Sequence, residues 1–113
     1  MYIFEAQFNL KPDAVAEEML RLFNELAVPI FRKIPGLISM SIYKYSVAGD
    51  NPPEWEYAWV EVWESKEAHG KAIGKYIGDV KNSELAKTGY YDKFLPMMEK
   101  YSMAFATPIA SSK

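Results

Sequence analysis

The alternation of hydrophobic and polar positions along the chain predicts four β-strands. Successive side chains of a strand point to opposite faces of a sheet, so alternate positions share one environment. Tyr2–Asn9 alternates in this way, with one row of aromatic and small apolar residues and one more polar row. Segments rich in β-branched and aromatic residues predict further strands at Leu37–Val47, Trp55–Glu64 and Tyr101–Thr107.

Apolar residues at helical spacing predict a helical region after the first strand and another after the third. In the first region they recur every three or four positions: Val15, Met19, Leu22, Phe23, Leu26 and Ile30. Pro12 is suited to the first helical position, and Pro29 should kink or end this helix. The second helix should begin after Ser65, which is suited to cap it, and run to about Val80.

Glycines interrupt the second helical region. Gly70, Gly74 and Gly78 form a row at helical spacing, and each glycine inside a helix costs about 1 kcal/mol relative to alanine. Packing must offset that cost, or the helix is irregular, and such a row leaves room for close packing or for a ligand. The following segment, Ser83–Lys100, reads as a helix broken by Gly89 and Pro96.

The element order is β-α-β-β-α-β, which is typical of the ferredoxin-like fold of the α+β class. It predicts one four-stranded antiparallel sheet with helices on one face. A chain of 113 residues is long enough for one domain with a core, and we place that domain at residues 1–108. Residues 109–113 are expected to form a flexible C-terminal tail.

The sheet face away from the helices is also predicted to be apolar. The residues assigned to that face are Tyr2, Phe4, Phe8, Ala58, Val60 and Val62. An uncovered apolar face of this size is an interaction surface, and the simplest cover is the same face of a second copy. We therefore expect a homodimer in which two sheets close into a barrel.

Composition excludes several classes of function. The net charge is −2, and the 13 basic residues form no run, which argues against binding to nucleic acid or to an anionic membrane. With no cysteine and one histidine, we expect no disulfide and no metal site, and we expect no cofactor. No signal peptide and no membrane-length apolar run is recognisable, so we expect a cytoplasmic protein.

One row of the third strand carries candidate chemistry. It alternates bulky aromatic residues around a single carboxylate: Trp55, Tyr57, Trp59, Glu61 and Trp63. Tyr57, Trp59 and Trp63 are suited to stacking on a flat aromatic ligand, or else they form a large core. Burial would raise the pKa of Glu61 and make it a general base. The alternative is a structural Glu61, paired with a lysine or hydrogen-bonded to a tyrosine.

Two further polar residues are candidates. His69 is the only histidine, and its intrinsic pKa suits acid–base catalysis near neutrality. It falls early in the second helix, near the end of the strand that carries Trp63, although a histidine without a task fits the pattern as well. Gln7, on the polar row of the first strand, is a candidate to hydrogen-bond a ligand carbonyl, or it is satisfied by neighbours.

Several short segments resemble the antibiotic-biosynthesis-monooxygenase-like domains of the dimeric α/β-barrel superfamily. They are Pro35-Gly36, the stretch Val60–Ser65 followed by Glu67-Ala68, and Ser83–Leu85. The resemblance spans roughly residues 1–108. It implies a pocket inside each subunit, between sheet and helices, lined by the aromatic row of the third strand. It also implies that the row of Ala58, Val60 and Val62 lines the dimer barrel.

The family's functional residues carry over only in part. Trp63 matches a strand tryptophan of members that oxidise polyketides, whereas Trp59 stands where those members have asparagine and His69 where they have a helix tyrosine. Ala72 stands where quinol-type members have histidine. The positions that haem-degrading members need hold other residues here: Gln7, Ala72 and Asn82. The resemblance therefore does not extend to haem degradation.

Three functional hypotheses follow from these residues and from the resemblance. The first is a cofactor-independent monooxygenase acting on a small electron-rich aromatic molecule of quinol or polyphenol type, with Glu61 or His69 as base. The second is a non-catalytic dimeric barrel that binds a small hydrophobic molecule. The third is a lyase or isomerase of the same superfamily, in which Glu61 or His69 shuttles a proton.

Overall fold

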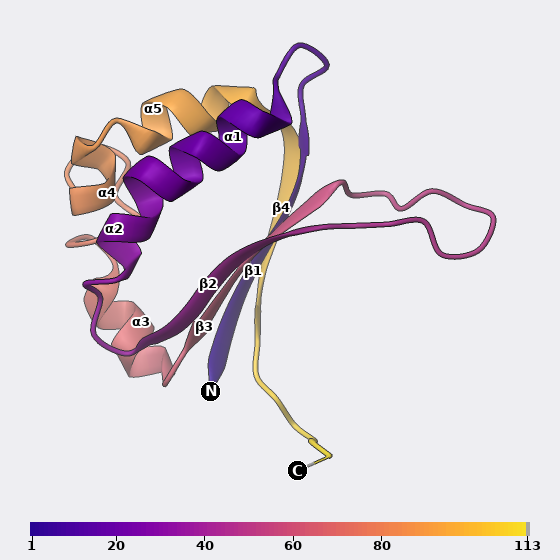
Figure 1. Ribbon diagram of the computed structural model, residues 1–113. Helices are drawn as coiled ribbons and strands as arrows, with labels where there is room; N and C mark the ends of the chain where they lie inside the picture. The colour runs from indigo at the N-terminus through magenta and orange to yellow at the C-terminus, as the bar shows by residue number, and fades with distance from the viewer. Residues whose placement is uncertain (113) are drawn as a thin grey trace.

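A computed structural model describes residues 1–112 of the chain, and Figure 1 shows one sheet with its helices on one side. The elements in chain order are β1 (Tyr2–Leu10), α1 (Ala16–Leu22), a π-helical segment η1 (Phe23–Ala27), α2 (Val28–Phe31), β2 (Leu37–Lys44), β3 (Tyr57–Trp63), α3 (Lys66–Ala72), α4 (Glu84–Lys87), α5 (Tyr90–Phe94), a 3₁₀ turn η2 (Leu95–Met97) and β4 (Met98–Ala106). The strands form a four-stranded antiparallel sheet in the order β2-β3-β1-β4. The predicted α+β, ferredoxin-like class is confirmed.

The register between strands corrects the prediction of which residues face away from the helices. Tyr2, Phe4 and Phe8 of β1 pair with Trp63, Glu61 and Tyr57 of β3. Directly paired residues share a face, so all three β1 residues lie on the face that the helices cover, and Phe8 is buried in the core. The prediction that they face away from the helices is wrong. Alternation assigns residues to a row, but the pairing register decides which face that row takes.

The sheet face away from the helices carries small and aliphatic side chains with a few polar ones. The register places these residues on it: Ile3, Glu5, Gln7, Asn9, Ser39, Ser41, Tyr43, Ala58, Val60, Val62, Lys100, Ser102, Ala104 and Ala106. In the single chain Ala58 is buried, Val60 and Val62 are half-buried, and Tyr43 is exposed. This face is therefore mixed in polarity, with the aromatic Tyr43 on its β2 edge.

The first helical region is continuous but not uniform. Pro12 lies in a turn, and α1 begins only at Ala16, so the predicted helix start at Pro12 is wrong. Pro29 follows directly on the π-helical segment, in which the Val28 N–H donates to the Phe23 carbonyl. Proline has no N–H to continue the α-helical pattern, and a π-helical turn lets the chain pass this point without a break.

The second helical region is much shorter than predicted. Ser65 caps α3 as predicted, since its hydroxyl oxygen accepts a hydrogen bond of 3.1 Å from the Ala68 N–H. The helix ends at Ala72 and does not reach Val80. Gly74 has φ +91°, in the left-handed region that other residues avoid, and this conformation cannot continue a right-handed helix.

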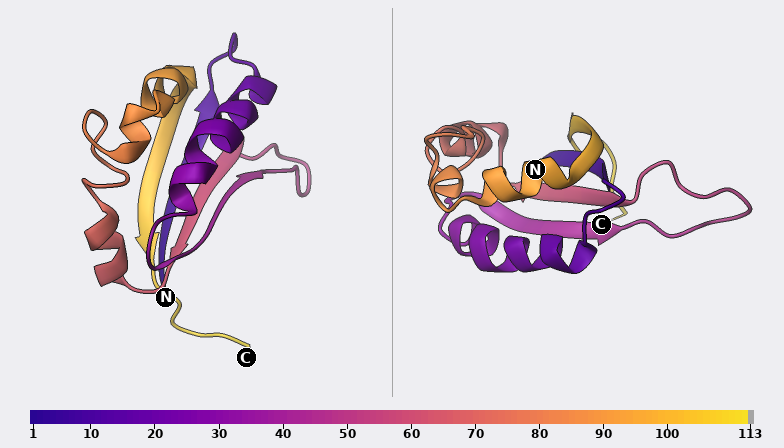
Figure 2. Two further views of the ribbon diagram at one scale, coloured as in Figure 1. Left: turned by 60° about the vertical axis from the view of Figure 1, so that its left-hand side comes forward. Right: turned by 90° about the horizontal axis from the view of Figure 1, so that it is seen from above.

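The rest of this region is broken, as the sequence predicted. Gly89, at φ +84°, separates α4 from α5, and Pro96 lies in the 3₁₀ turn before β4. Figure 2 shows α1 and α2 over one half of the sheet and α3 to α5 over the other half, beside β4. The two helical regions therefore cover different strands.

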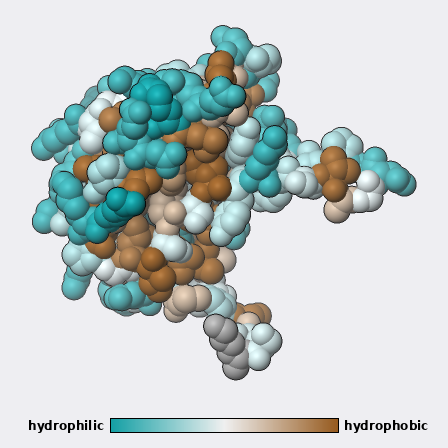
Figure 3. All heavy atoms as spheres, viewed as in Figure 1, coloured by the Kyte–Doolittle hydropathy of each residue, from teal (hydrophilic) through white to brown (hydrophobic). Residues whose placement is uncertain are grey.

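The core lies between the sheet and both helical regions. Its buried members from the first region are Met19, Leu22, Phe23, Ala27, Ile30 and Phe31, and those from the second are Ala72, Ile77, Leu85, Tyr90 and Phe94. Phe23 and Phe31 meet the Trp59 ring edge-on, each at a centroid distance of 5.7 Å. Figure 3 shows hydrophobic atoms gathered along the seam between the helices and the sheet.

Two segments extend away from this layered body. Residues 45–56, between β2 and β3, form the long arm that projects from the sheet in Figure 1. Residues 107–112 form no helix or strand, and Ile109 is almost fully exposed. The flexible tail at 109–113 stays a prediction, and Lys113 lies outside the described residues. Within residues 1–112 no helix has the length and apolar character needed to cross a membrane.

A candidate ligand cavity beneath the second helical region

A cavity of about 640 Å³ lies between the broken helices and the β1–β4 half of the sheet. Its wall on the sheet includes Phe4, Ala6, Phe8, Trp59 and Glu61, and its opposite wall includes Ile73, Ile77, Tyr90, Tyr91 and Phe94. The volume falls within the range of small-molecule sites, and so does the pattern of an apolar wall with few polar groups. Of the aromatic row of the third strand, Trp59 and Glu61 line this cavity.

The cavity exists because the helical cover is interrupted and because β4 is an edge strand. Ile73, Gly78 and Val80, from the irregular segment after α3, contribute to its wall. On β4, Tyr101, Met103 and Phe105 line the cavity and are each more than half exposed. Of these three side chains Phe105 meets His69 of α3, yet all three stay more than half exposed, and a ligand can enter along this edge.

Glu61 is the buried carboxylate of the cavity wall, with 4% of its surface exposed. The Trp59 indole Nε1–H donates to one carboxylate oxygen at 2.7 Å, and the Trp63 indole Nε1–H donates to the other at 3.0 Å. All three side chains come from β3 and lie two residues apart, so the strand itself sets this geometry. The structural partners expected from the sequence were a lysine or a tyrosine, and the structure has two tryptophans instead.

Burial raises the pKa of Glu61, and the two indole N–H donors offset part of that rise by stabilising the charged form. A carboxylate offers about four lone-pair sites, and the indoles use two of them. The remaining sites can accept a hydrogen bond from a ligand hydroxyl. Glu61 is therefore equipped to hold a phenolic ligand and to take its proton.

The three aromatic residues predicted to stack on a ligand have different positions. Trp59 lines the cavity, and its ring centroid lies 6.0 Å from that of Tyr90. Trp63 has no exposed surface and is not among the cavity residues. Tyr57 stacks on Phe8 at 5.4 Å, away from the cavity. Trp59 can meet a ligand ring, while Trp63 acts on the cavity through its bond to Glu61.

His69 lines the cavity beside the exposed edge. Its ring lies 5.2 Å from Trp63, 5.2 Å from Phe105 and 5.7 Å from Tyr2. Burial among these rings lowers the pKa of His69, so the imidazole is neutral at pH 7. No hydrogen bond within residues 1–112 joins His69 to Glu61, and the two groups do not form a catalytic pair in this state.

Gln7 lies on the opposite face of the sheet from the cavity. It pairs with Ala58, and its side-chain Nε2 donates to the Tyr45 hydroxyl at 3.0 Å. The alternative considered from the sequence, a glutamine satisfied by neighbours, describes this geometry. The cavity lining contains Glu61 and His69 but not Gln7.

Sequence reasoning missed two tyrosines at the start of α5. The Tyr91 hydroxyl accepts a 2.9 Å hydrogen bond from the Gly78 N–H and so ties the irregular segment to α5. The Tyr90 hydroxyl is buried and has no hydrogen-bond partner among residues 1–112. The available signal was the pair of tyrosines after Gly89, with Phe94 four residues beyond Tyr90.

The described residues provide little that could hold a metal ion. Within residues 1–112, no three His, Cys, Asp or Glu side chains come together in a possible metal-binding group. The polar side chains of the cavity are instead few: the carboxyls of Glu61 and Glu99, the imidazole of His69 and three tyrosine phenols. Such a set binds an organic ligand through a few directed hydrogen bonds and many apolar contacts.

The sequence of residues 1–72 matches the family described as "Antibiotic biosynthesis monooxygenase". The match covers more than half of the chain and includes Glu61 and His69, but it ends before α4 and α5. No curated protein has a matching sequence.

Solved structures with the same fold match nearly the whole chain. A protein of Arabidopsis thaliana, At3g17210, has a TM-score of 0.71 at 15% identity, with 100% of both chains covered. SnoaB, a cofactor-independent oxygenase from Streptomyces nogalater solved as a mutant, has a TM-score of 0.64 at 14% identity, with 98% of this chain and 95% of that chain covered. A putative antibiotic biosynthesis monooxygenase from Nitrosomonas europaea has a TM-score of 0.65 at 14% identity, covering 97% and 100%. At these identities the likeness establishes the fold.

Proposed function

Because this chain belongs to the antibiotic biosynthesis monooxygenase family, we propose that it is a cofactor-independent monooxygenase of a small electron-rich aromatic molecule, of quinol or polyphenol type. One observation carries the proposal: a single carboxyl, Glu61, is buried in the wall of an otherwise mostly aromatic and aliphatic cavity. The fold shared with SnoaB, a cofactor-independent oxygenase, adds support at the level of architecture.

The proposed reaction uses dioxygen as the oxidant and the substrate as the reductant. Glu61 takes the hydroxyl proton of the phenolic (enol) tautomer, and the resulting carbanion adds dioxygen at the ring carbon that is CH₂ in the keto tautomer. The protonated Glu61 returns its proton to the new peroxide, which then loses water and leaves a carbonyl. The sum is CH₂ + O₂ → C=O + H₂O. The apolar walls exclude water from the intermediate, and Trp59 supports the flat ring.

Oxygen uptake with a panel of phenolic anthrones and quinols of the menadiol class tests this proposal. The Glu61→Gln variant should lower the enzyme-dependent rate at least about 100-fold, since general-base catalysis contributes that much or more. His69→Ala should have a smaller effect, because His69 lies at the exposed edge and Glu61 in the buried wall.

The matched control is Glu64→Gln, the same substitution at an exposed carboxylate at the end of the same strand. It should leave the rate unchanged, and protein-free reactions correct for autoxidation of the substrates. A wild-type rate in Glu61→Gln would overturn the role of Glu61. If no substrate of the panel consumes oxygen faster with the protein than without it, the proposed monooxygenase activity is overturned.

A second candidate, a barrel that binds a small hydrophobic molecule without turnover, is favoured by one observation. Both oxygens of Glu61 already accept an indole N–H, which stabilises the carboxylate and weakens it as a base. Saturable quenching of tryptophan fluorescence by the same aromatics, without oxygen uptake, would select this candidate. A lyase or isomerase using Glu61 or His69 would instead show proton exchange into the bound ligand.

We further propose that the functional unit is a cytoplasmic homodimer of the domain at residues 1–108, joined through the sheet face that the helices leave uncovered. Val60, Val62 and Ile3 lie centrally on that face and are only half-buried in the single chain. Val60→Lys would place a charge there and should convert a dimer to a monomer in sedimentation experiments. A wild-type protein that sediments as a monomer at micromolar concentration would overturn this proposal.

A further inference from the structure

The Tyr90 hydroxyl is a buried polar group of a cavity residue that nothing in the described residues satisfies. Tyr90 has no exposed surface, and its hydroxyl oxygen has no hydrogen-bond partner within residues 1–112. A buried hydroxyl without a partner is destabilising, so such groups in native proteins call for an explanation. Tyr90 is one of the residues of the cavity wall, so a small shift of the rings around its buried hydroxyl would let a ligand supply the missing partner.

Packing holds this side chain firmly. The Tyr90 ring stacks on Phe94 at 5.2 Å with an interplanar angle of 11°, and it meets Trp59 at 6.0 Å. Both neighbours present ring surfaces, and the Tyr91 ring lies 6.2 Å away with its hydroxyl already accepting the Gly78 N–H. A phenylalanine would fill the same ring site without the uncompensated hydroxyl. The hydroxyl therefore lowers the stability of the ligand-free protein, and it makes no hydrogen bond that would offset this cost.

The chemistry of the hydroxyl specifies what it would bind. Burial raises the pKa of Tyr90 well above its ordinary value, so the phenol stays protonated and acts as a donor. Glu61, in the same cavity, is an acceptor whose two indole partners leave lone pairs free. One donor and one acceptor in an apolar cavity select a ligand that has both an acceptor oxygen and a hydroxyl group.

We propose that Tyr90 is a specificity-determining residue of this cavity, whose hydroxyl donates a hydrogen bond to a carbonyl oxygen of the ligand while Glu61 accepts one from a ligand hydroxyl. The inference rests on the proposed function only in that both place an aromatic ligand in this cavity. The sequence match to the family ends at residue 72, so it assigns nothing to Tyr90.

Tyr91 supplies a matched control on the same helix. Its hydroxyl already accepts the Gly78 N–H, so it has the structural bond that Tyr90 lacks. Tyr91→Phe removes that bond and should lower the Tm of the ligand-free protein. Tyr90→Phe removes only an unsatisfied hydroxyl, and it should leave the ligand-free Tm unchanged or raise it.

The binding test uses two probes that differ by one carbonyl. Both 5-hydroxy-1-tetralone and 5,6,7,8-tetrahydro-1-naphthol carry a phenolic hydroxyl for Glu61, and only the tetralone offers a carbonyl to Tyr90. Titration calorimetry should give a Kd for the tetralone about tenfold higher in Tyr90→Phe than in the wild type, the effect of one lost hydrogen bond. The Kd for the tetrahydronaphthol should not change.

Each other outcome overturns a defined part of the argument. If Tyr90→Phe lowers the ligand-free Tm as Tyr91→Phe does, the Tyr90 hydroxyl has a structural partner such as an internal water, and the inference fails. If the tetralone binds equally to wild type and Tyr90→Phe, the cavity remains an aromatic site and only the role of Tyr90 is lost. If neither probe binds the wild type, the cavity is not a site for aromatic ligands, and both the proposed function and the inference about Tyr90 are wrong.

Discussion

The two helical regions cover the same sheet, yet one makes a solid core and the other makes a cavity. From Ala16 to Phe31 the chain stays helical without a break, and its apolar side chains fill the space above Trp59. From Lys66 to Met97 the chain forms three short helices and a 3₁₀ turn, with a cavity of about 640 Å³ beneath them. The same β-α-β plan thus gives a filled half and a hollow half.

Continuity of the helix explains the difference. A continuous helix presents a side chain to the sheet every three or four residues and fills the interface. Gly74, Gly78 and Gly89 all have positive φ and turn the chain away from that course. Trp59 lies at the boundary between the halves, since its ring meets Phe23 and Phe31 on the packed side and lines the cavity on the other. Both halves therefore contribute buried core residues, and the second half also leaves space for a ligand.

The largest expected effect is a difference in cost between truncations in the two halves. Leu22→Ala removes a side chain with 2% exposure in the packed half and should lower the free energy of unfolding by about 3 kcal/mol. Ile73→Ala removes one with 45% exposure in the cavity wall and should cost about 1 kcal/mol or less. Urea denaturation of both variants measures the difference, and equal costs would contradict the division into a filled and a hollow half.

The pH dependence of stability tests the buried carboxyl of the hollow half. The pKa of Glu61 is raised in the folded protein, so the folded state holds this proton more tightly than the unfolded chain does. Below the ordinary value of 4.5 both states are protonated, and Glu61 contributes no pH dependence. As the pH rises above 4.5, the unfolded chain loses the proton first, and stability falls until the folded pKa is passed.

The Glu61→Gln variant cannot titrate at this position and removes this contribution. The free energy of unfolding of the wild type should therefore fall relative to that of Glu61→Gln as the pH rises from 4.5 towards neutrality. Groups common to both proteins, including His69, cancel in the difference. Urea unfolding at a series of pH values measures it, and a constant or rising difference would mean that Glu61 is not held in an apolar site.

The next effect concerns the glycines that shorten the helix of the hollow half. Gly70 lies inside α3 with ordinary helical geometry and open space around it, so Gly70→Ala should stabilise the protein by about 0.5–1 kcal/mol. Gly74 also has open space, but its φ of +91° strains any other residue, so Gly74→Ala should destabilise the protein by about 1 kcal/mol. Opposite signs in thermal unfolding would show that conformation, and not crowding, ends the helix.

The local sequence pattern was sufficient to predict the four strands, and it also predicted which residues of the third strand share one face. Alternation placed Trp59, Glu61 and Trp63 on one face, and the structure places them there, with both indoles bonded to the carboxylate. Pattern could not decide which face of the first strand meets the helices, because Phe4 and Phe8 are assigned by pairing across strands. The same limit led to the expectation that Gln7 belongs with the ligand.

The cavity itself depends on conformations that composition does not encode. The glycine row fits either a costly helix or a break, and only the positive φ at Gly74 and Gly78 decides between them. Tyr90 lay in a segment that the sequence predicted simply as a broken helix. Its importance comes from what is missing around its hydroxyl, and a missing partner has no signature in sequence.

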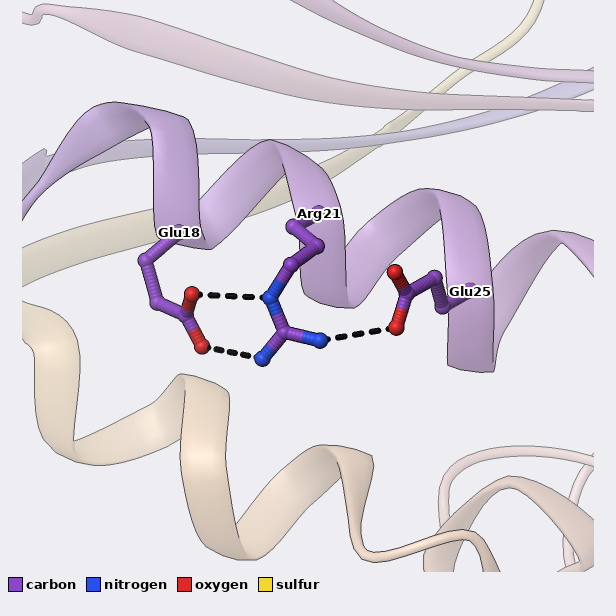
Figure 4. Close-up of polar contacts among 3 residues, drawn as sticks. All are labelled: Glu18, Arg21 and Glu25. Atoms are coloured by element: carbon purple, nitrogen blue, oxygen red, sulfur yellow. Dashed lines mark hydrogen bonds and ion pairs between the residues drawn. The ribbon is translucent and has the colours of Figure 1, made fainter.

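The smallest expected effect lies on the outer surface of the filled half. On the solvent side of the first helical region, Arg21 pairs with Glu18 and with Glu25, three and four residues away (Figure 4). All three side chains are largely exposed, and exposed pairs contribute little because water and salt screen them. Arg21→Met keeps the helix-forming character of the position and should lower the Tm slightly at low ionic strength. In about 1 M salt, where the Debye length is about 3 Å, the two proteins should melt together. A large loss that persists in high salt would mean that this network, and not the buried contacts of Leu22 and Phe31, holds the filled half in place.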